Sequence, residues 1–312
     1  MRKVVVIGGS AGGIDAVCSI VRHLPTDFSA PILIVIHIGE TENMLPAVLQ
    51  RCTKVEVVSP AEPEPIVASR IYVAPPNRHL VVRADCVMAI QGPRENRHRP
   101  AIDTLFRSVA RAYRSNVVAV IVSGALDDGV TGCLAVQARG GTVIVQDPTE
   151  AQIDAMPANV LRQIKTAHCL RLEKIATSLL ELASNGKPIR QNNGRPIHCP
   201  DEAESFPMTE PLAYTCPECH GTLLKISDGK SEQFRCNVGH IYSLDSFSVA
   251  HSNAVERALW MALERLNEKR SVQGHLAKRA KDAIMKRRYH ENAAAAAEDM
   301  RLLKEILGRL LA

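Results

Sequence analysis

The sequence predicts an α/β fold with a doubly wound, mostly parallel sheet, followed by a small Cys/His module and a C-terminal helical tail. Three observations predict it. Short β-branched runs alternate with stretches of helical periodicity over residues 1–184, as expected for βαβ units. Four cysteines and histidines at metal-ligand spacing lie within residues 213–248. Apolar residues recur every three or four positions over residues 249–312, which indicates helix.

The strands and helices of the first part follow from this alternation. Leu80–Val82 and Cys86–Ile90 flank a short turn and predict an inserted antiparallel hairpin. The remaining predicted strands are Val4–Ile7, Pro31–Ile36, Lys54–Val58, Arg70–Val73, Val117–Val122 and Thr142–Val145, and the predicted helices are Ile14–His23, Asn43–Arg51, Ile102–Tyr113, Thr131–Arg139, Ala158–Ile164 and Lys174–Ala183.

The composition bounds the class of protein. The chain has 312 residues, 46% of them hydrophobic, but no apolar run approaches the ~20 residues that span a bilayer. The first apolar run is also too short for a signal peptide, so we expect a cytoplasmic protein with no membrane insertion. Nine cysteines in a chain without a secretion signal argue against a disulfide framework.

The first strand ends in an unusual turn, Gly8-Gly9-Ser10-Ala11-Gly12-Gly13. The spacing Gly8-x-Ser10-x-Gly12 fits a nucleophile elbow, in which a serine stands between a strand and a helix N-terminus. The same turn also resembles a dinucleotide-binding fingerprint, with Glu40 as the ribose-binding acid, and the turn alone favours that second interpretation.

Candidate partners for a serine nucleophile follow two other strands. His37 ends the second strand and could act as base, and Asp127 or Asp128 could orient it. Taken singly, these residues are typical of a structural histidine and a helix N-cap. Together they favour a Ser-His-Asp triad, whose chain order differs from that of standard α/β-hydrolases.

Seven stretches of residues 1–184 match one known family in order and spacing. They are Ile7-Gly8-Gly9-Ser10-Ala11-Gly12-Gly13, Val35-Ile36-His37, Tyr72-Val73-Ala74-Pro75-Pro76-Asn77-Arg78-His79-Leu80, Gly92-Pro93, Asn96-Arg97-His98-Arg99-Pro100-Ala101-Ile102-Asp103, Ser123-Gly124-Ala125-Leu126-Asp127-Asp128-Gly129 and Met156-Pro157. Through them, residues 1–184 resemble the catalytic domain of the chemotaxis protein-glutamate methylesterases. The resemblance implies a doubly wound α/β domain in which Ser10, His37 and Asp128 form the triad, Asp128 being the aspartate that precedes the glycine.

The resemblance also implies the reaction. The substrate would be a glutamate methyl ester on the cytoplasmic helices of a chemoreceptor, and glutamine deamidation would use the same steps without a cofactor for catalysis. Ala11 and Ala125 stand where the family often has threonine and methionine, near the expected oxyanion and substrate. Arg97, His98 and Arg99 could line the substrate approach, or belong to a solvated loop.

The best-known members of that family carry a phosphorylatable receiver domain before the esterase. This sequence starts at the first esterase strand, so we expect no regulation by phosphorylation in cis.

A metal site is predicted after a linker at residues 185–212. Cys216, Cys219, Cys236 and His240 form two knuckles, and three thiolates with one imidazole suit a closed, structural Zn²⁺ site. His220 is a rival ligand, but its position beside Cys219 disfavours it. We expect a zinc ribbon over residues 213–248, in which strands at Pro211–Thr215 and Gln233–Arg235 each precede one knuckle. The other six cysteines are expected to be ordinary.

The tail carries the net charge. Residues 1–250 hold 25 basic and 25 acidic residues, whereas residues 251–312 hold 13 and 8. With only Trp260 and Tyr289 available for stacking, nucleic-acid binding is disfavoured. We expect a helical interaction tail that packs on a signalling protein or a second copy, with the stripe from Val255 to Leu266 as a candidate dimerisation face. The helical spacing continues at Leu276, Ala280, Ile284, Leu302, Ile306 and Leu310.

Two interpretations remain beside the esterase. A non-catalytic chemosensory binding or regulatory module would keep the fold without turnover, and Ala11 and Ala125 leave that open. Dinucleotide binding would leave His37 without a role.

Overall fold

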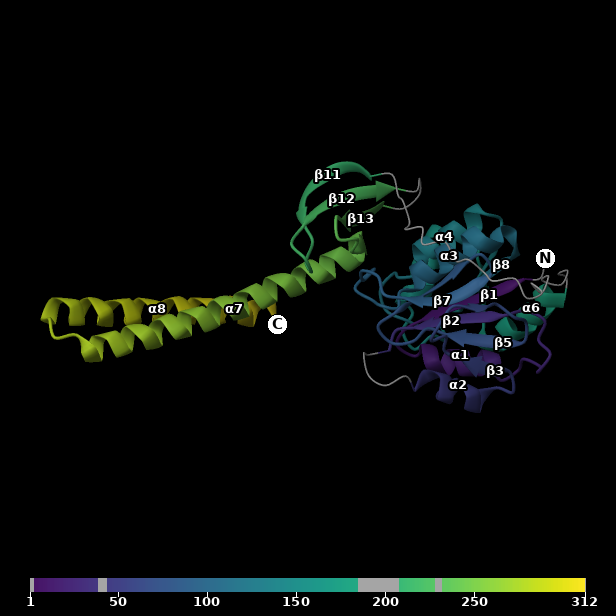
Figure 1. Ribbon diagram of the computed structural model, residues 1–312, viewed down its shortest axis with the longest axis horizontal. Helices are drawn as coiled ribbons and strands as arrows, with labels where there is room; N and C mark the ends of the chain where they lie inside the picture. The colour runs from purple at the N-terminus through teal and green to yellow at the C-terminus, as the bar shows by residue number, and fades with distance from the viewer. Residues whose placement is uncertain (1–2, 39–43, 185–207, 228–231, 312) are drawn as a thin grey trace. The chain divides into compact units, whose positions relative to one another are not determined.

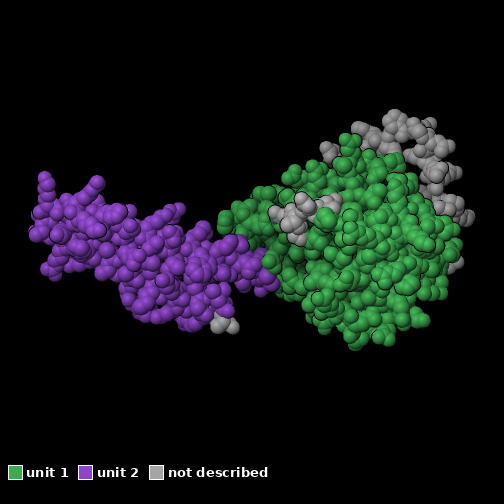
Figure 2. All heavy atoms as spheres, turned by 90° about the horizontal axis from the view of Figure 1, so that it is seen from below, with its two compact units in different colours: residues 1–247 green, residues 248–312 purple. Residues whose placement is uncertain are grey.

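The computed structural model describes residues 3–38, 44–184, 208–227 and 232–311. They form two compact units, residues 1–247 and residues 248–312 (Figure 2). The predicted linker lies outside the described residues up to position 207, as does Glu40.

A seven-stranded sheet forms the centre of the first unit, in the order β10-β9-β8-β1-β2-β5-β3 (Figure 1). Every strand pair in it is parallel. From β1 the chain first builds one side of the sheet with β2, β3 and β5 and then the other side with β8, β9 and β10, so the strand order reverses at β1. The strands are β1 (Val4–Gly9), β2 (Ile32–Ile36), β3 (Glu56–Val58), β5 (Arg70–Val73), β8 (Val117–Ile121), β9 (Thr142–Gln146) and β10 (His168–Leu170).

Helices cover both faces of this sheet, because alternate side chains of its strands are apolar on either side. In β1, Val4 and Val6 belong to one buried cluster and Val5 and Ile7 to the other. The first cluster takes in α3 (Ile102–Tyr113), α4 (Val130–Ala138) and α5 (Ala155–Gln163), and the second takes in α1 (Gly13–Val21), α2 (Leu45–Cys52) and α6 (Leu172–Ser184). The predicted α/β class with a mostly parallel sheet is therefore confirmed.

The inserted hairpin is present as β6 (His79–Arg83) and β7 (Cys86–Ile90), and β4 (Glu64–Pro65) pairs with β7 to complete a small antiparallel sheet. Three short segments were not predicted from the sequence: β4, β10 and the 3-10 turn Arg114–Asn116. These segments have two or three residues each, too few for a recognisable periodicity.

A four-stranded antiparallel sheet follows, in the order β11-β12-β13-β14. We call residues 208–243 the ribbon. Its strands are β11 (Met208–Thr215), β12 (Thr222–Ser227), β13 (Glu232–Cys236) and β14 (Ile241–Ser243). The first strand thus begins within the predicted linker, and β12 and β14 were not anticipated.

Two long helices complete the chain, α7 (Leu244–Arg279) and α8 (Ala283–Leu310). Asp282 caps α8, because its side chain accepts a hydrogen bond from the Met285 amide at 2.8 Å. Within the second unit, Asn292 of α8 donates to Gln273 of α7 at 3.3 Å. None of the described helices is long and apolar enough to cross a membrane.

The burial of apolar side chains in this helix pair follows from packing rather than from spacing. Leu307 and Ala296 of α8 and Ala277 of α7 are buried, whereas Leu302 and Ile306 are exposed. Apolar residues occur on more than one face of α8, so their three- and four-residue spacing indicates a helix without showing which face is buried.

Candidate active site and metal centre

Ser10 follows β1 at the point where the strand order reverses, the position at which open α/β sheets bind ligands. Its amide donates to the Ser123 carbonyl at 2.9 Å, and its carbonyl accepts from Gly13 at 2.8 Å. The turn requires glycine at position 12, where φ is +75°. A side chain at Gly124 would place its Cβ only 2.9 Å from the Cβ of Ser10. The loops that follow β1 and β8 therefore meet at the serine.

His37 is brought beside this turn by the pairing of β1 with β2. Gly9 pairs with Ile36, and the His37 amide donates to the Gly9 carbonyl at 3.0 Å. Ser10 and His37 therefore follow neighbouring positions of adjacent strands. The Nε2 atom of His37 lies 2.8 Å from the Asp128 carboxylate, whereas its Nδ1 is buried and makes no hydrogen bond to any described residue.

Asp128 is buried and its carboxylate is surrounded by donors. Besides His37 it accepts from the amides of Ile102 at 2.7 Å and Asp103 at 3.1 Å, and from the Asn96 side chain at 3.1 Å. Burial alone would raise the pKa of this carboxyl. The hydrogen bond to His37 and the neighbouring histidine charge lower it more, so the pKa of Asp128 falls well below its usual value.

A second carboxyl, Asp103, lies in the same buried network. One oxygen accepts from the amides of Gly129 and Gly132 at 2.9 and 2.6 Å, and the other from Asn96 at 3.0 Å. Burial, then repulsion from Asp128, raises the pKa of Asp103 to about 8. Asp128 therefore carries the negative charge of the pair near neutral pH.

Among the predicted substrate-side residues, His98 lies closest to the candidate triad. Its ring stacks on that of His37, with centroids 3.6 Å apart. Burial, followed by the charge of His37, lowers the pKa of His98 to about 4. Ala11 and Ala125, at the ends of β1 and β8, are exposed.

The two arginines of the predicted approach differ in their surroundings. Arg99 donates to the side-chain oxygen of Asn77 and to the Gly92 carbonyl, both at 2.6 Å. These bonds connect the loop to the chain just before β6 and just after β7. Arg97 is half-buried and adopts a φ of +71°.

The two adjacent aspartates have different partners. Asp128 contacts His37, whereas Asp127 accepts from the hydroxyl of Ser243 at 2.9 Å. Burial raises the pKa of Asp127 to about 6, although the Ser243 hydrogen bond opposes this shift. The geometry therefore pairs the histidine with the second aspartate of the motif.

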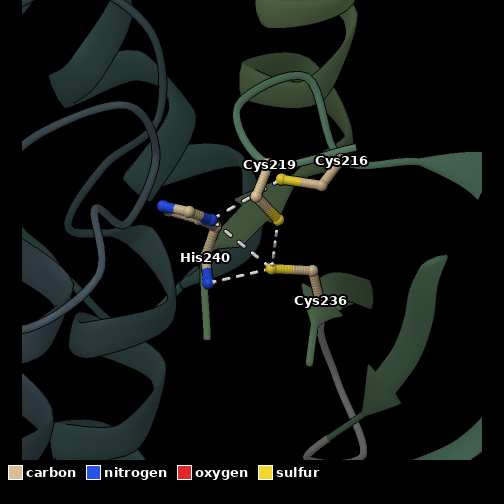
Figure 3. Close-up of side chains that lie close together, drawn as sticks. All are labelled: Cys216, Cys219, Cys236 and His240. Carbon is tan, nitrogen blue, oxygen red and sulfur yellow. Dashed lines mark hydrogen bonds between the residues drawn. The ribbon is translucent and has the colours of Figure 1, made fainter. Parts of the chain in front are cut away.

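Cys216, Cys219, Cys236 and His240 converge in the ribbon (Figure 3), with their ligand atoms all within 4.8 Å of one another. The Nδ1 of His240 lies 3.6 Å from the sulfur of Cys216 and 3.4 Å from that of Cys236. Cys219 and Cys236 have their sulfurs 3.5 Å apart. Ligands of a tetrahedral zinc, at about 2.0–2.3 Å from the metal, are separated by roughly these distances.

The surroundings of His240 suit a ligand that binds through Nδ1. Its other nitrogen, Nε2, lies 3.5 Å from the Glu218 carboxylate, an arrangement that commonly orients metal-bound histidines. His220, the rival ligand, is exposed and is not among the four converging residues.

The expectation that all six cysteines outside the metal cluster are ordinary is wrong for two of them. Cys18 of α1 and Cys52 of α2 form a disulfide, with their Cα atoms 5.3 Å apart. They are 34 residues apart in sequence, and composition could not reveal that α1 and α2 pack side by side.

Asn96 and Asp103 were missed as site residues, although both lie in the motif quoted above. The available signal was a pair of polar residues flanking the start of α3, whose other side chains are mostly apolar. His98 was singled out, but its stacking on His37 could not be derived from the sequence.

Comparisons with known proteins agree with this architecture. The family model described as CheB methylesterase matches residues 5–179. A putative protein-glutamate methylesterase/protein-glutamine glutaminase of Leptospira interrogans is 37% identical over 185 residues, covering 59% of this chain and 96% of the relative. A protein-glutamate methylesterase/protein-glutamine glutaminase of Trichodesmium erythraeum is 33% identical over 184 residues, covering 57% of this chain and 52% of the relative.

A solved structure shares the fold of the first unit. The crystal structure of the Thermotoga maritima CheB methylesterase catalytic domain matches 58% of this chain and 99% of its own length, with a TM-score of 0.55 and 31% identity. The family match, which spans more than half of the chain, establishes that this protein belongs to the CheB methylesterase family.

Proposed function

We propose that this protein is a serine hydrolase that removes methyl groups from glutamate methyl esters of chemoreceptors and deamidates receptor glutamines. The observation that carries the proposal is the hydrogen bond between His37 and Asp128 beside the Ser10 turn, at the switch point of the sheet. The relatives' names supply the substrate class. The substrate glutamates would lie on cytoplasmic receptor helices, which places the reaction in the cytoplasm.

In the first half of the reaction, Ser10 attacks the ester carbonyl while His37 takes its proton. Because Nε2 of His37 is bonded to Asp128, Nδ1 is the nitrogen available to accept that proton. The ionised Asp128 stabilises the imidazolium that forms. The imidazolium then protonates the leaving methoxide, and methanol departs from an acyl-enzyme.

Water completes the cycle. It attacks the acyl-enzyme with His37 again as base, which releases the receptor glutamate and regenerates the serine hydroxyl. A glutamine side chain follows the same path, with ammonia in place of methanol. Backbone amides at Ala11 or the Ala125 turn would stabilise the oxyanion, and each such donor lowers the activation barrier by roughly 3–4 kcal/mol in related chemistry.

Residues 97–99 have separate roles in this proposal. His98 and Arg97 line the substrate approach, since His98 covers one face of the His37 ring. Arg99 holds the loop through Asn77 and is a positioning residue.

The test measures methanol release from a methylated cytoplasmic receptor fragment, with Ser10→Ala as the matched control. Labelling of Ser10 by a fluorophosphonate, located by peptide mass spectrometry, reports the nucleophile without any receptor. We expect release and labelling in the wild type and neither in the variant. Release by a folded Ser10→Ala protein would disprove the serine mechanism. No release from several receptors would support a non-catalytic regulatory module.

We further propose that the four-residue cluster of the ribbon holds a structural Zn²⁺. Three thiolates and an imidazole fill a tetrahedral shell and leave no position for a substrate water, so the metal would supply folding energy rather than chemistry. Elemental analysis should find one zinc per chain in the wild type and a loss in Cys216→Ser. The exposed, non-cluster cysteine provides the control Cys169→Ser, which should keep the metal.

A further inference from the structure

The ribbon is hydrogen-bonded to the loop that approaches the candidate triad. The Asn96 amide donates to the Ile241 carbonyl at 2.8 Å, and the Ile241 amide donates to the Arg94 carbonyl at 3.3 Å. Glu95 and Ile241 form a parallel bridge. Nearby, a Cβ at Gly239 would lie 2.9 Å from Pro93. Strand β14 therefore lies against the loop of residues 93–98.

The Asn96 side chain connects the ribbon to the carboxylates. Its oxygen accepts from the Ser243 amide and from the Ser246 hydroxyl, both at 3.0 Å. Its nitrogen donates to Asp128 at 3.1 Å and to Asp103 at 3.0 Å. The donors on one side and the acceptors on the other fix which way the amide points.

This connection is buried. Asn96 is 2% exposed and Ser246 is fully buried. Deleting the Ser246 hydroxyl at such a site removes one of the two hydrogen bonds that the Asn96 oxygen accepts, so the Asn96 side chain is held less firmly. Because Ser246 is fully buried, solvent water cannot replace its hydroxyl after a deletion. The deletion therefore acts directly on Asn96, to which this hydroxyl donates.

A second contact runs parallel to the first. The Ser243 hydroxyl donates to Asp127 at 2.9 Å, the residue immediately before Asp128. Gln233 of β13 donates to Thr131 in the first turn of α4 at 3.3 Å. The ribbon thus touches both sides of the segment that carries the triad acid.

The metal cluster and this contact share one stretch of chain. His240 directly precedes Ile241, and its carbonyl accepts from the Cys236 amide at 3.1 Å. The knuckle that would close around a metal therefore leads without interruption into β14 and the two serines. Cys216 and Cys219, from the other knuckle, supply the remaining two residues of the metal cluster.

We propose that the ribbon and the first turn of α7, which follows it directly, are a structural part of the esterase site: Ser243 of the ribbon and Ser246 of α7 are positioning residues that, through Asn96, hold Asp128 against His37, so turnover requires the metal-closed ribbon. This inference rests on the proposed function. A misplacement of the catalytic groups by even an ångström costs up to about 100-fold in rate.

The test uses the full chain and four variants. Ser246→Ala removes the hydroxyl, Ser246→Thr restores it, and Ser243→Ala removes its bond to Asp127. Thr222→Ala, which deletes an exposed hydroxyl of the same ribbon, is the matched control. Circular dichroism checks that each variant folds.

Two readouts separate positioning from general stability. The first is kcat and KM for methanol release: we expect kcat of Ser246→Ala to fall about tenfold or more with KM unchanged, and Ser246→Thr to recover it. The second is the downfield ¹H NMR signal of the imidazole N–H between His37 and Asp128, identified by its loss in His37→Gln. That signal should shift or broaden in Ser246→Ala and stay unchanged in Thr222→Ala.

Chelation of the wild-type protein gives an independent arm. We expect the downfield signal and the rate of Ser10 labelling by fluorophosphonate to fall together on metal removal and to return with Zn²⁺. Unchanged kcat and an unchanged N–H signal in Ser246→Ala, or full Ser10 labelling in the metal-free chain, would overturn the inference. Absence of methanol release from the wild type would instead count against the proposed function, since the N–H signal and the labelling do not depend on a receptor.

Discussion

The chemistry of the site depends on one negative charge in a buried pair of carboxyls. Asp128 receives three hydrogen bonds besides that of His37, while the pKa of Asp103 rises to about 8 through burial and the nearby charge. Two such groups whose environments separate their pKa values have separate roles. Asp128 is the charged partner of the histidine, and Asp103 organises the amides of the following helix.

The first prediction concerns the choice between neighbouring aspartates. Asp128→Asn should reduce kcat by about 10⁴-fold, because an amide cannot hold the productive histidine tautomer or stabilise its cation. Asp127→Asn should reduce it far less, because Asp127 contacts Ser243 rather than His37. Methanol release by both folded variants measures the difference. A larger loss in Asp127→Asn would move the triad acid to the first position.

The second prediction concerns His98 and acid stability. The folded pKa of His98 is about 4, below the unfolded value of about 6.5. Between these values the unfolded chain binds more protons, so this group's stabilising contribution is present above pH 6.5 and is lost as pH falls toward 4. The pKa difference corresponds to roughly 3 kcal/mol.

His98→Phe keeps a ring beside His37 but cannot titrate. Its free energy of unfolding, measured by urea titration from pH 7 to pH 4, should therefore fall less steeply than that of the wild type. His275→Gln replaces an exposed histidine of the tail and should keep the wild-type dependence. Equal slopes for His98→Phe and the wild type would show that His98 protonates as readily in the folded protein as in the unfolded chain.

The candidate triad could be predicted because Ser10, His37 and Asp128 follow strand ends, and parallel strands end at one edge of a sheet. The supporting residues could not. Asn96 contacts Asp128 only because a loop lies beneath the start of α3, and Ser243 and Ser246 contact Asn96 from about 150 positions away. Sequence periodicity carries no information about such packing.

At the scale of elements, most strands and helices of residues 1–184 were predicted to within about three residues of their ends, because their apolar residues follow the helix or strand period. The helix Ile102–Tyr113 and the strand Arg70–Val73 agree with the structure residue for residue. The buried face of α8 could not be predicted, since only the helix pairing within the second unit selects Leu307 over Ile306. The link between α1 and α2 was also missed, because it depends on how two helices pack over one face of the sheet.

The third prediction follows from that link. The Cys18–Cys52 disulfide closes a loop of 34 residues, so reduction should lower the free energy of unfolding by about 3–4 kcal/mol in the chain-entropy model. Urea titrations with and without dithiothreitol measure this. Cys18→Ser should show the lower value in both conditions, whereas Cys169→Ser, at an exposed free cysteine, should behave as the wild type. Alkylation of Cys18 and Cys52 in native, unreduced protein would contradict the bond.

At the scale of the whole molecule, the chain separates into a unit that holds the complete site and a unit made of helices. Ser10, His37, Asp128 and the metal cluster all lie within residues 1–247. The helical unit of residues 248–312 carries exposed apolar side chains such as Ile284 and Leu310. That this unit binds a second copy or a signalling protein, rather than nucleic acid, stays a prediction. Light scattering of the purified protein tests self-association.

The last prediction concerns the dependence of turnover on that tail. A chain ending after Arg257 keeps the ribbon, Ser243, Ser246 and the first turns of α7, so it keeps every residue that the mechanism uses. Because domains with their own cores fold and act independently unless a large interface joins them, its kcat on a receptor fragment should stay within about threefold of the wild type. Ser10→Ala in the shortened chain provides the blank for the assay. If the shortened protein melts as the wild-type first unit does but turns over at least tenfold more slowly at saturating substrate, the tail takes part in catalysis. A rise in KM alone would mean that the tail helps to capture the receptor, while the site itself works without it.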